Sequence, residues 1–156
     1  IDALIEVRKA GGMRLIPIDE FFLGYKKLAL KSQEIVTAIY IPILKGNHLS
    51  KLYKVSVRKD LDISAVTMAA RLKLKGNKIE EARLTFGGVG PTVARLKTIE
   101  KSWVGKDFDP EMIRRSSGEL KDLISPLSDV RGSKEYRLLL CQNLLKKMAD
   151  ELEQGV

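Results

Sequence analysis

The sequence contains one cysteine and one histidine among its 156 residues. Cys141 cannot form an intrachain disulfide, and Cys141 and His48 together cannot supply the ligands of an iron–sulfur cluster or a zinc finger. Any such centre must therefore come from another chain or domain. The apolar runs are short and interrupted, which argues against a membrane span or a signal peptide, so we expect a cytoplasmic protein.

Aromatic residues are scarce, at 6% of the sequence, and no strand carries the aromatic motif with which RNA-binding domains stack bases. This weakens a nucleic-acid interpretation of the net charge of +8. Residues 1–106 hold 20 Lys and Arg against 10 Asp and Glu, whereas residues 107–156 hold 8 against 10. The basic residues are spread along strand-like patterns and form no run. A solvated basic face is the simplest interpretation, and an anionic ligand or an acidic partner subunit is the alternative.

Two periodicities divide the chain. Up to residue 86 the apolar residues alternate or are β-branched, which is typical of strands, and after Gly90-Pro91 they recur with the period of a helix. Turns are predicted at Gly11-Gly12 and Gly76-Asn77, one helical turn at residues 17–22, and loops at residues 22–27 and 45–48. The predicted strands cover residues 3–8, 13–16, 34–41, 52–57, 63–74 and 78–86, and the predicted helices cover residues 93–103, 110–125 and 133–153.

Strands followed by a run of helices predict an α+β fold, in which a small antiparallel sheet packs under a helical layer. We place a domain boundary near residue 28, because the opening hairpin and helical turn are too small to form a domain by themselves. The sequence begins with Ile1 in the middle of a strand pattern. We therefore expect it to be a piece of a longer protein.

Two segments are candidates for ligand contact. Residues 86–92, FGGVGPT, lie between a predicted strand and a helix, where backbone N–H groups can face a phosphate or a flat ligand. A tight turn without a ligand is the alternative. Residues 58–62 hold four charges, which form either a solvated turn or a group of charges beside a cofactor. We interpret His48 as a surface residue and Cys141 and Trp103 as core, and no nucleophile–base pair stands out by its spacing.

Four segments in one order resemble the flavoprotein part of the molybdenum hydroxylases, and the nearest resemblance is to the FAD-binding subunit of bacterial xanthine dehydrogenases. They are residues 21–42 (FFLGYKKLALKSQEIVTAIYIP), 53–74 (YKVSVRKDLDISAVTMAARLKL), 80–100 (EEARLTFGGVGPTVARLKTIE) and 125–145 (SPLSDVRGSKEYRLLLCQNLL). The resemblance implies that residues 1–28 end an FAD-binding subdomain. Residues 29–156 would form a C-terminal domain like that of carbon monoxide dehydrogenase flavoproteins, with a three-stranded antiparallel sheet covered by three helices.

The resemblance also implies a route for electrons. A molybdopterin centre would hydroxylate a purine, and electrons would pass through two 2Fe–2S clusters to FAD and then to NAD. The molybdopterin and iron–sulfur centres would lie on other domains or subunits of an oligomeric assembly, which agrees with the single cysteine. Neither a membrane nor a nucleic acid is expected as a partner.

The family's functional residues can be carried over onto matching positions. Lys54, in YKVSVRK, matches an FAD-contacting lysine, and Val36 falls where the family has an apolar FAD contact. A lysine ammonium suits an electron-rich ring or a phosphate. Tyr25, Gly87 and Gly88 fall near the path of the nicotinamide nucleotide, where glycine allows the backbone to lie against a flat ring.

The loop around Asp60, Leu61 and Asp62 resembles the family's loop beside the flavin, which affects whether NAD or oxygen reaches it. Animal members carry a continuous acidic run there, whereas Leu61 interrupts it in this sequence. The choice between these acceptors therefore stays open.

The family's phosphate-binding glycine segment would precede Ile1. We therefore expect this chain by itself to bind FAD weakly or not at all, and to share the site with an upstream segment or a companion chain. Two alternatives remain. One is the flavoprotein part of an aldehyde, carbon monoxide or hydroxybenzoyl-CoA dehydrogenase, and the other is a non-enzymatic basic module that binds nucleic acid or an acidic partner.

Overall fold

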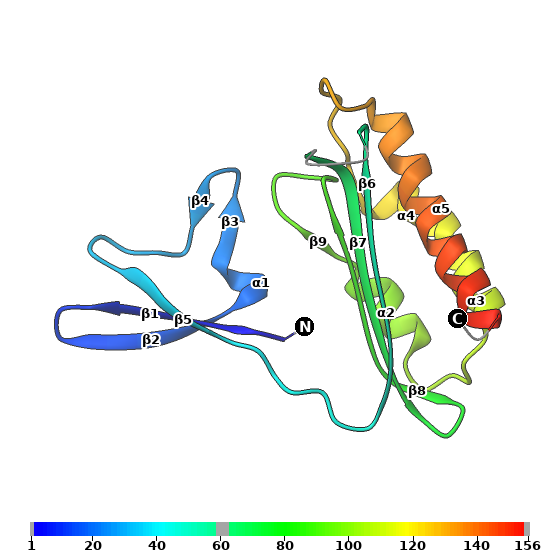
Figure 1. Cartoon of the computed structure of the whole chain (residues 1–156), viewed down its shortest axis with the longest axis horizontal. Coiled ribbons are helices and arrows are strands. Elements are labelled where there is room, and N and C mark those ends of the chain that lie inside the picture. Colours follow the sequence, from blue (N-terminus) through cyan, green and yellow to red (C-terminus); the bar gives the residue numbers. More distant parts are fainter. Residues whose placement is uncertain (1, 59–62, 155–156) are drawn as a thin grey trace. The chain divides into compact units, whose positions relative to one another are not determined.

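The structure is a computed structural model that describes residues 2–58 and 63–154. It divides into two compact units, Ile1–Lys45 and Gly46–Val156, each with its own sheet and apolar core (Figure 1). Within the described residues, no helix is long and apolar enough to cross a membrane.

The first unit is built on a three-stranded antiparallel sheet with the order β2-β1-β5. The predicted opening hairpin is confirmed, with Gly11 at a φ of +89° in its turn. The core of the unit is small and consists of Ile5, Val7, Ile16 and Phe21. Its elements are β1 (Leu4–Lys9), β2 (Gly12–Pro17), α1 (Ile18–Phe21), β3 (Phe22–Gly24), β4 (Lys27–Leu28) and β5 (Ile35–Tyr40). The short β3 and β4 pair where a loop is predicted.

The division between the units comes later in the chain than the predicted boundary near residue 28. Strand β5 pairs antiparallel with β1, and the partners run from Leu4 with Tyr40 to Arg8 with Ile35. This pairing turns the opening hairpin into a sheet that can cover a core, so the segment up to Lys45 belongs to the first unit. The observed boundary therefore corrects the predicted one. The prediction missed it because it depends on the pairing of two strands, β1 and β5, that lie far apart in the sequence.

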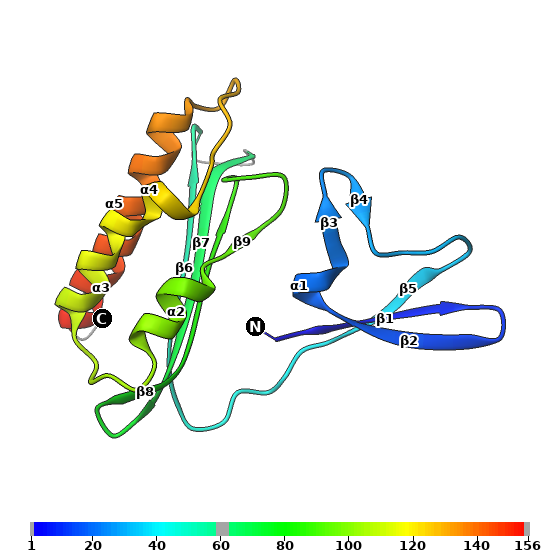
Figure 2. The ribbon, with the colours of Figure 1, turned by 180° about the vertical axis from the view of Figure 1, so that it is seen from behind.

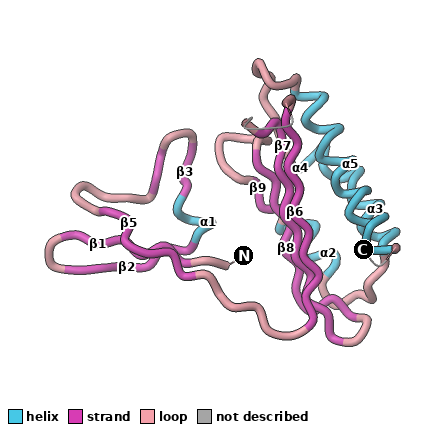
Figure 3. Tube along the Cα trace, in the orientation of Figure 1, coloured by secondary structure: helices cyan, strands magenta, loops and turns pink. Residues whose placement is uncertain are grey.

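The second unit contains the sheet of the predicted fold. Three long antiparallel strands form a meander, and the predicted three-stranded sheet is confirmed (Figure 1, Figure 3). They are β6 (Asn47–Ser56), β7 (Ser64–Lys75) and β8 (Lys78–Gly87). A two-residue strand, β9 (Ala94–Arg95), is added at the edge of β8. It occupies the start of the predicted helix 93–103, and His48 lies in β6 where a loop is predicted.

The helices follow the sheet in sequence and pack on it. They are α2 (Lys97–Trp103), α3 (Pro110–Ser116), a 3₁₀ turn (Ser117–Glu119), α4 (Leu120–Leu123) and α5 (Lys134–Glu153). Two starts follow from capping side chains. Asp109 accepts a hydrogen bond from the Glu111 N–H at 2.9 Å, and Ser133 accepts one from the Tyr136 N–H at 3.1 Å. The predicted second helix is thus split into α3 and α4 by the 3₁₀ turn.

Helices α3, α4 and α5 lie along one face of the sheet, as Figures 1 and 2 show from opposite sides. Alternate residues of β7 point into the core beneath them, among them Val66, Met68 and Leu72. The residues between these, Thr67 and Ala69 among them, lie on the opposite face. We call this second face the distal face of the sheet.

Candidate functional site

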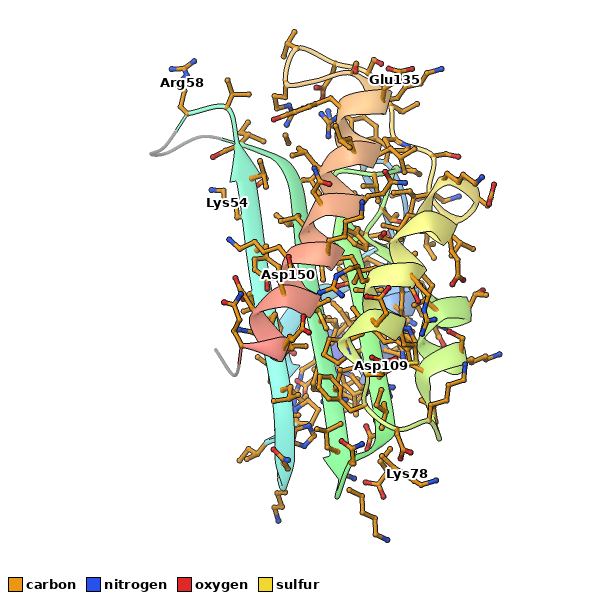
Figure 4. The ribbon with its side chains drawn as sticks, turned by 90° about the vertical axis from the view of Figure 1, so that its right-hand side faces the viewer. Lys54, Arg58, Lys78, Asp109, Glu135 and Asp150 are labelled. Carbon is orange, nitrogen blue, oxygen red and sulfur yellow. The ribbon has the colours of Figure 1, made fainter. Side chains whose placement is uncertain are left out.

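Two predicted site residues, Lys54 and Gly87, lie in one row across the sheet. Lys54 of β6 is the register partner of Thr67 on β7, and Thr67 is the register partner of Gly87 on β8. Since neighbouring strands are about 4.8 Å apart, the Lys54 and Gly87 backbones are separated by roughly 10 Å. Lys54 is exposed on the edge strand, where Figure 4 labels it. We call Lys54, Thr67 and Gly87 the cross-strand row.

Small side chains extend this row along the distal face. Two residues after Thr67 on β7, Ala69 is the register partner of Leu52 on β6 and of Thr85 on β8. Leu52 is 79% exposed. Around the cross-strand row, the distal face therefore carries an ammonium group, small side chains and an exposed apolar side chain.

Thr67 is a site residue that the sequence reasoning missed. An ideal Cβ placed on Gly87 would lie 2.4 Å from Thr67 Oγ1. The hydroxyl of Thr67 thus fills the space that a side chain at position 87 would need. The sequence did not contain this signal. A regular hairpin that turns at Gly76-Asn77 would bring Thr67 opposite Phe86, and only the register shift between Lys73 and Leu74 brings Thr67 opposite Gly87.

Gly88 directly follows Gly87, at the bend of the backbone where β8 ends, and we call this bend the corner. Its φ is +79°, a backbone conformation that residues other than glycine rarely adopt. A Cβ there would lie 2.4 Å from the carbonyl oxygen of Ala65 and 3.1 Å from Arg137 Nη1. Internal packing by itself therefore explains glycine at positions 87 and 88, and the approach of a nucleotide to them stays a prediction.

Arg137 of α5 is the second residue that the sequence reasoning missed. Its guanidinium is buried and donates from Nη1 to the carbonyl oxygens of Ala65, at 2.6 Å, and Gly88, at 2.8 Å. Nη2 donates to Asp129 Oδ1 at 2.6 Å. The signal in the sequence was a basic residue on the apolar side of the last helix, one turn before Cys141.

The pKa of Asp129 is lowered, first by the hydrogen bond from the backbone N–H of Arg131 and then by Arg137. The carboxylate is therefore ionised at neutral pH and balances the buried guanidinium. Asp129 also forms an ion pair with the Arg131 side chain at 2.9 Å. The buried cation thus has a fixed anionic partner in the segment before α5.

Two further predicted residues, Val36 and Tyr25, belong to the first unit. Val36 lies in β5 opposite Val7 of β1, and its side chain is 44% exposed. Tyr25 lies between β3 and β4 and is 76% exposed. Both side chains are accessible, and their roles toward FAD and the nicotinamide nucleotide stay predictions.

Asp60, Leu61 and Asp62 lie outside the described residues. Described residues on either side of them border a hollow of about 450 Å³. It is lined by Val57, Arg58, Ile63, Val130 and Arg131.

The described residues include no group of His, Cys, Asp and Glu side chains that could hold a metal ion. Cys141 is buried in the core of the second unit, as predicted. The cross-strand row offers a cation at Lys54, a hydroxyl at Thr67 and a backbone position without a side chain at Gly87.

Comparison with known proteins finds two families that match this chain, one in each unit. The family described as CO dehydrogenase flavoprotein C-terminal domain matches residues 51–152. The family described as FAD binding domain in molybdopterin dehydrogenase matches residues 1–44. These matches meet at nearly the same place as the division between the two units.

Curated relatives cover nearly the whole chain. The glyceraldehyde dehydrogenase medium chain of Sulfolobus acidocaldarius is 32% identical over 97% of this chain and 53% of its own length. The xanthine dehydrogenase FAD-binding subunit of Escherichia coli O157:H7 is 32% identical over 96% of this chain and 52% of its own length. The chain thus spans about half the length of these relatives.

Among solved structures, a carbon monoxide dehydrogenase from Hydrogenophaga pseudoflava superimposes with a TM-score of 0.87. The superposition covers 94% of this chain and 51% of that one, at 22% sequence identity, and therefore shows the fold. The predicted α+β fold of this flavoprotein type is confirmed.

The fold and the matched segments define part of a flavoprotein of the molybdenum hydroxylases. More particularly, the chain belongs to the CO dehydrogenase flavoprotein C-terminal domain family, and its residues 1–44 match the FAD binding domain in molybdopterin dehydrogenase, so the two units together resemble the FAD-binding part of a molybdenum hydroxylase. The resemblance inferred from the four sequence segments is thereby confirmed.

Proposed function

We propose that this chain is the electron-transfer flavoprotein segment of a xanthine dehydrogenase-like molybdenum hydroxylase, an oxidoreductase, and that it passes electrons from iron–sulfur clusters through FAD to NAD. The family matches support the FAD-binding role. The observation that carries the assignment of a flavin contact to this chain is the register that aligns Lys54 with Thr67 and Gly87.

The residues of the cross-strand row fit a flavin nucleotide. An exposed lysine provides a mobile positive charge with three hydrogen-bond donors, which suits a phosphate or the electron-rich part of a ring. Thr67 can donate or accept a hydrogen bond, and Gly87 adds no side chain to the surface. A planar group can therefore approach the row closely.

FAD, when bound, would supply the transfer of electrons singly or as hydride. The contribution of this chain is to hold and orient the nucleotide and to adjust its electrostatic surroundings. Lys54 and Val36 would contact FAD. The loop that contains Asp60, Leu61 and Asp62 would control access to it, and Tyr25, Gly87 and Gly88 would lie on the path of the nicotinamide nucleotide.

The remaining redox centres would come from partners. The chain has one cysteine, which is buried, so the ligands of two 2Fe–2S clusters would come from another domain or subunit, as would the molybdopterin. One relative is named a medium chain and another an FAD-binding subunit, and such names support a multi-subunit enzyme. We propose that this enzyme is cytoplasmic. The first half of the FAD site would be supplied by an upstream segment or companion chain.

The proposed role of Lys54 is tested by Lys54→Ala in the assembled flavoprotein. We expect FAD affinity to fall between about tenfold and about 150-fold, because a hydrogen bond to a charged group contributes about 1.5–3 kcal/mol. The measurement is FAD occupancy by visible absorbance during dilution, together with the reduction potential of the flavin.

The matched control is Lys75→Ala, which removes the same charge from the exposed hairpin end of the sheet. This variant should retain FAD as the wild type does. Unchanged flavin occupancy and potential in Lys54→Ala would contradict the role of Lys54.

A second candidate is an aldehyde-oxidising enzyme of the same family. The aldehyde and xanthine dehydrogenase relatives are equally similar to this chain, at 32% identity each. Whole-enzyme assays with hypoxanthine and with glyceraldehyde, each with NAD as the acceptor, would separate the two. Turnover of glyceraldehyde without turnover of hypoxanthine would favour the second candidate.

A further inference from the structure

We infer that Arg137 is a positioning residue for the flavin-contacting surface, because its guanidinium joins the ends of β7 and β8 and so keeps Thr67 and Gly87 in line with Lys54. The inference rests on the proposed function and extends it to a residue that the family resemblance did not identify.

The bonds of Arg137 converge on the end of the sheet where the cross-strand row lies. One nitrogen, Nη1, donates to the carbonyl oxygens of Ala65 and Gly88 at 2.6 and 2.8 Å. Ala65 precedes Thr67 by two residues, and Gly88 directly follows Gly87. A single group therefore ties together the two strands that carry two of the three residues of the row.

The corner leaves little freedom for any other arrangement. The position that a Gly88 Cβ would take is 3.1 Å from Nη1 and 2.4 Å from the carbonyl oxygen of Ala65. The backbone of the corner thus packs directly onto the carbonyl that Arg137 holds. A shift of the guanidinium would move this carbonyl and would displace Thr67 relative to Gly87.

The position of Arg137 in its helix supports a role beyond stabilising α5. It lies near the N-terminal end of α5, where the helix dipole disfavours a cation. Burial of a charge also opposes folding unless the charge is paired. Asp129 provides the pairing, with 2.6 Å between Oδ1 and Nη2.

Arginine is the side chain best suited to donate to two carbonyl oxygens and a carboxylate together. Its planar guanidinium presents several donors in fixed directions, so it can serve two carbonyls and a carboxylate at once. A lysine at position 137 would keep the charge but would lose the planar fork. A methionine would leave the two carbonyl oxygens without their donor.

The experiment compares Arg137→Met, Arg137→Lys and Asp129→Asn in the assembled flavoprotein, at a temperature where each variant is fully folded. We expect FAD to bind about tenfold more weakly in Arg137→Met, with a changed visible spectrum and a shifted flavin potential. Arg137→Lys should restore part of the affinity. Asp129→Asn keeps the arginine but weakens the contact that holds its guanidinium at the corner, and it should weaken binding by about threefold, so the test does not depend on the folding of Arg137→Met.

The control is Arg114→Gln, which breaks an exposed ion-pair cluster between α3 and the far end of α5. Arg114 pairs there with Asp150 at 2.7 Å and Glu153 at 3.0 Å. Arg114→Gln should lower the stability of the second unit and should leave the FAD affinity, the visible spectrum and the flavin potential as in the wild type. If Arg114→Gln changed the flavin signals as much as Asp129→Asn, the effect would be general loosening of α5 and the inference would be overturned.

Failure of the inference can be distinguished from failure of the proposed function. Loss of FAD in Lys54→Ala, with wild-type flavin properties in both Arg137→Lys and Asp129→Asn, would overturn the inference alone. Wild-type FAD binding in Lys54→Ala would instead count against the proposed flavin contact.

Discussion

At the scale of single residues, two adjacent glycines are required for different reasons. Gly87 makes room for the hydroxyl of Thr67, whereas Gly88 combines a positive φ with contact to the carbonyl oxygen of Ala65. The two effects act on neighbouring positions of one corner. Packing therefore explains the two adjacent glycines of the GGVG motif, which lie beside the surface that we propose for the flavin.

Gly88→Ala should lower the free energy of unfolding by more than Gly105→Ala. Gly105 has a similar φ of +83° but has nothing within 4 Å of its Cβ position, so this variant measures the backbone strain alone, about 1 kcal/mol. Gly88→Ala adds a clash at 2.4 Å and should cost at least about 2 kcal/mol. Urea unfolding of both variants provides the comparison, and equal losses would show that the corner relaxes without cost.

At the scale of elements, the pairing of β1 with β5 is stabilised by one carboxylate. Glu6 of β1 accepts hydrogen bonds from Arg8 Nε at 2.7 Å, from the Thr37 hydroxyl at 2.6 Å and from the Tyr40 hydroxyl at 2.7 Å. Thr37 and Tyr40 both belong to β5. These bonds, that of Arg8 first, lower the pKa of Glu6 from 4.5 to about 2.

The pKa of Glu6 predicts how the stability of the first unit depends on pH. Because the pKa is lowered in the folded state, the stabilisation is complete above about pH 4.5 and is lost as the pH falls toward 2. Glu34, paired with Arg14, has its pKa lowered to about 2 as well and contributes over the same range. Glu6→Gln should therefore be less stable at neutral pH and should lose less stability than the wild type on acidification.

Thermal unfolding between pH 2 and pH 7 is the measurement for Glu6→Gln. Glu20→Gln is the control, since it removes an exposed carboxylate from the same unit. Identical pH profiles for the wild type and Glu6→Gln would show that the hydrogen bonds to Glu6 do not stabilise the pairing of β1 with β5.

At the scale of the whole molecule, each unit has its own core, and that of the second unit is much the larger. Trp103 is fully buried in it and donates from Nε1 to Ser116 Oγ at 2.9 Å. Cys141 of α5 is fully buried in the same core. The second unit thus contains in its interior both a natural fluorophore and a natural thiol probe.

Cys141 should report the opening of the whole second unit. Burial raises the pKa of its thiol to about 12, so in the folded state the thiol is both protonated and inaccessible. We expect a disulfide reagent to label the native protein only at the rate of unfolding and to label the denatured protein promptly with one equivalent. Trp103 fluorescence should change at the same rate. Prompt labelling of the native protein would mean that α5 opens locally.

The sequence was informative wherever local chemistry decides the structure. The turns at Gly11-Gly12 and Gly76-Asn77 and the long last helix follow from patterns within a few residues. Expectations failed where pairing between strands decides the structure. The division at residue 45, the strand at 94–95 and the place of His48 in β6 are all examples.

The candidate site divides in the same way. By itself, the sequence determined the residues that we propose for contact with a flavin nucleotide, such as Lys54 and the glycines, and the single cysteine, which is too few for the ligands of an iron–sulfur cluster. Only the tertiary structure decided that Thr67 completes the row between Lys54 and Gly87 and that Arg137 ties the corner together. The physical reason is that strand register and the burial of a charge arise from contacts between segments distant in the chain, which no local pattern contains.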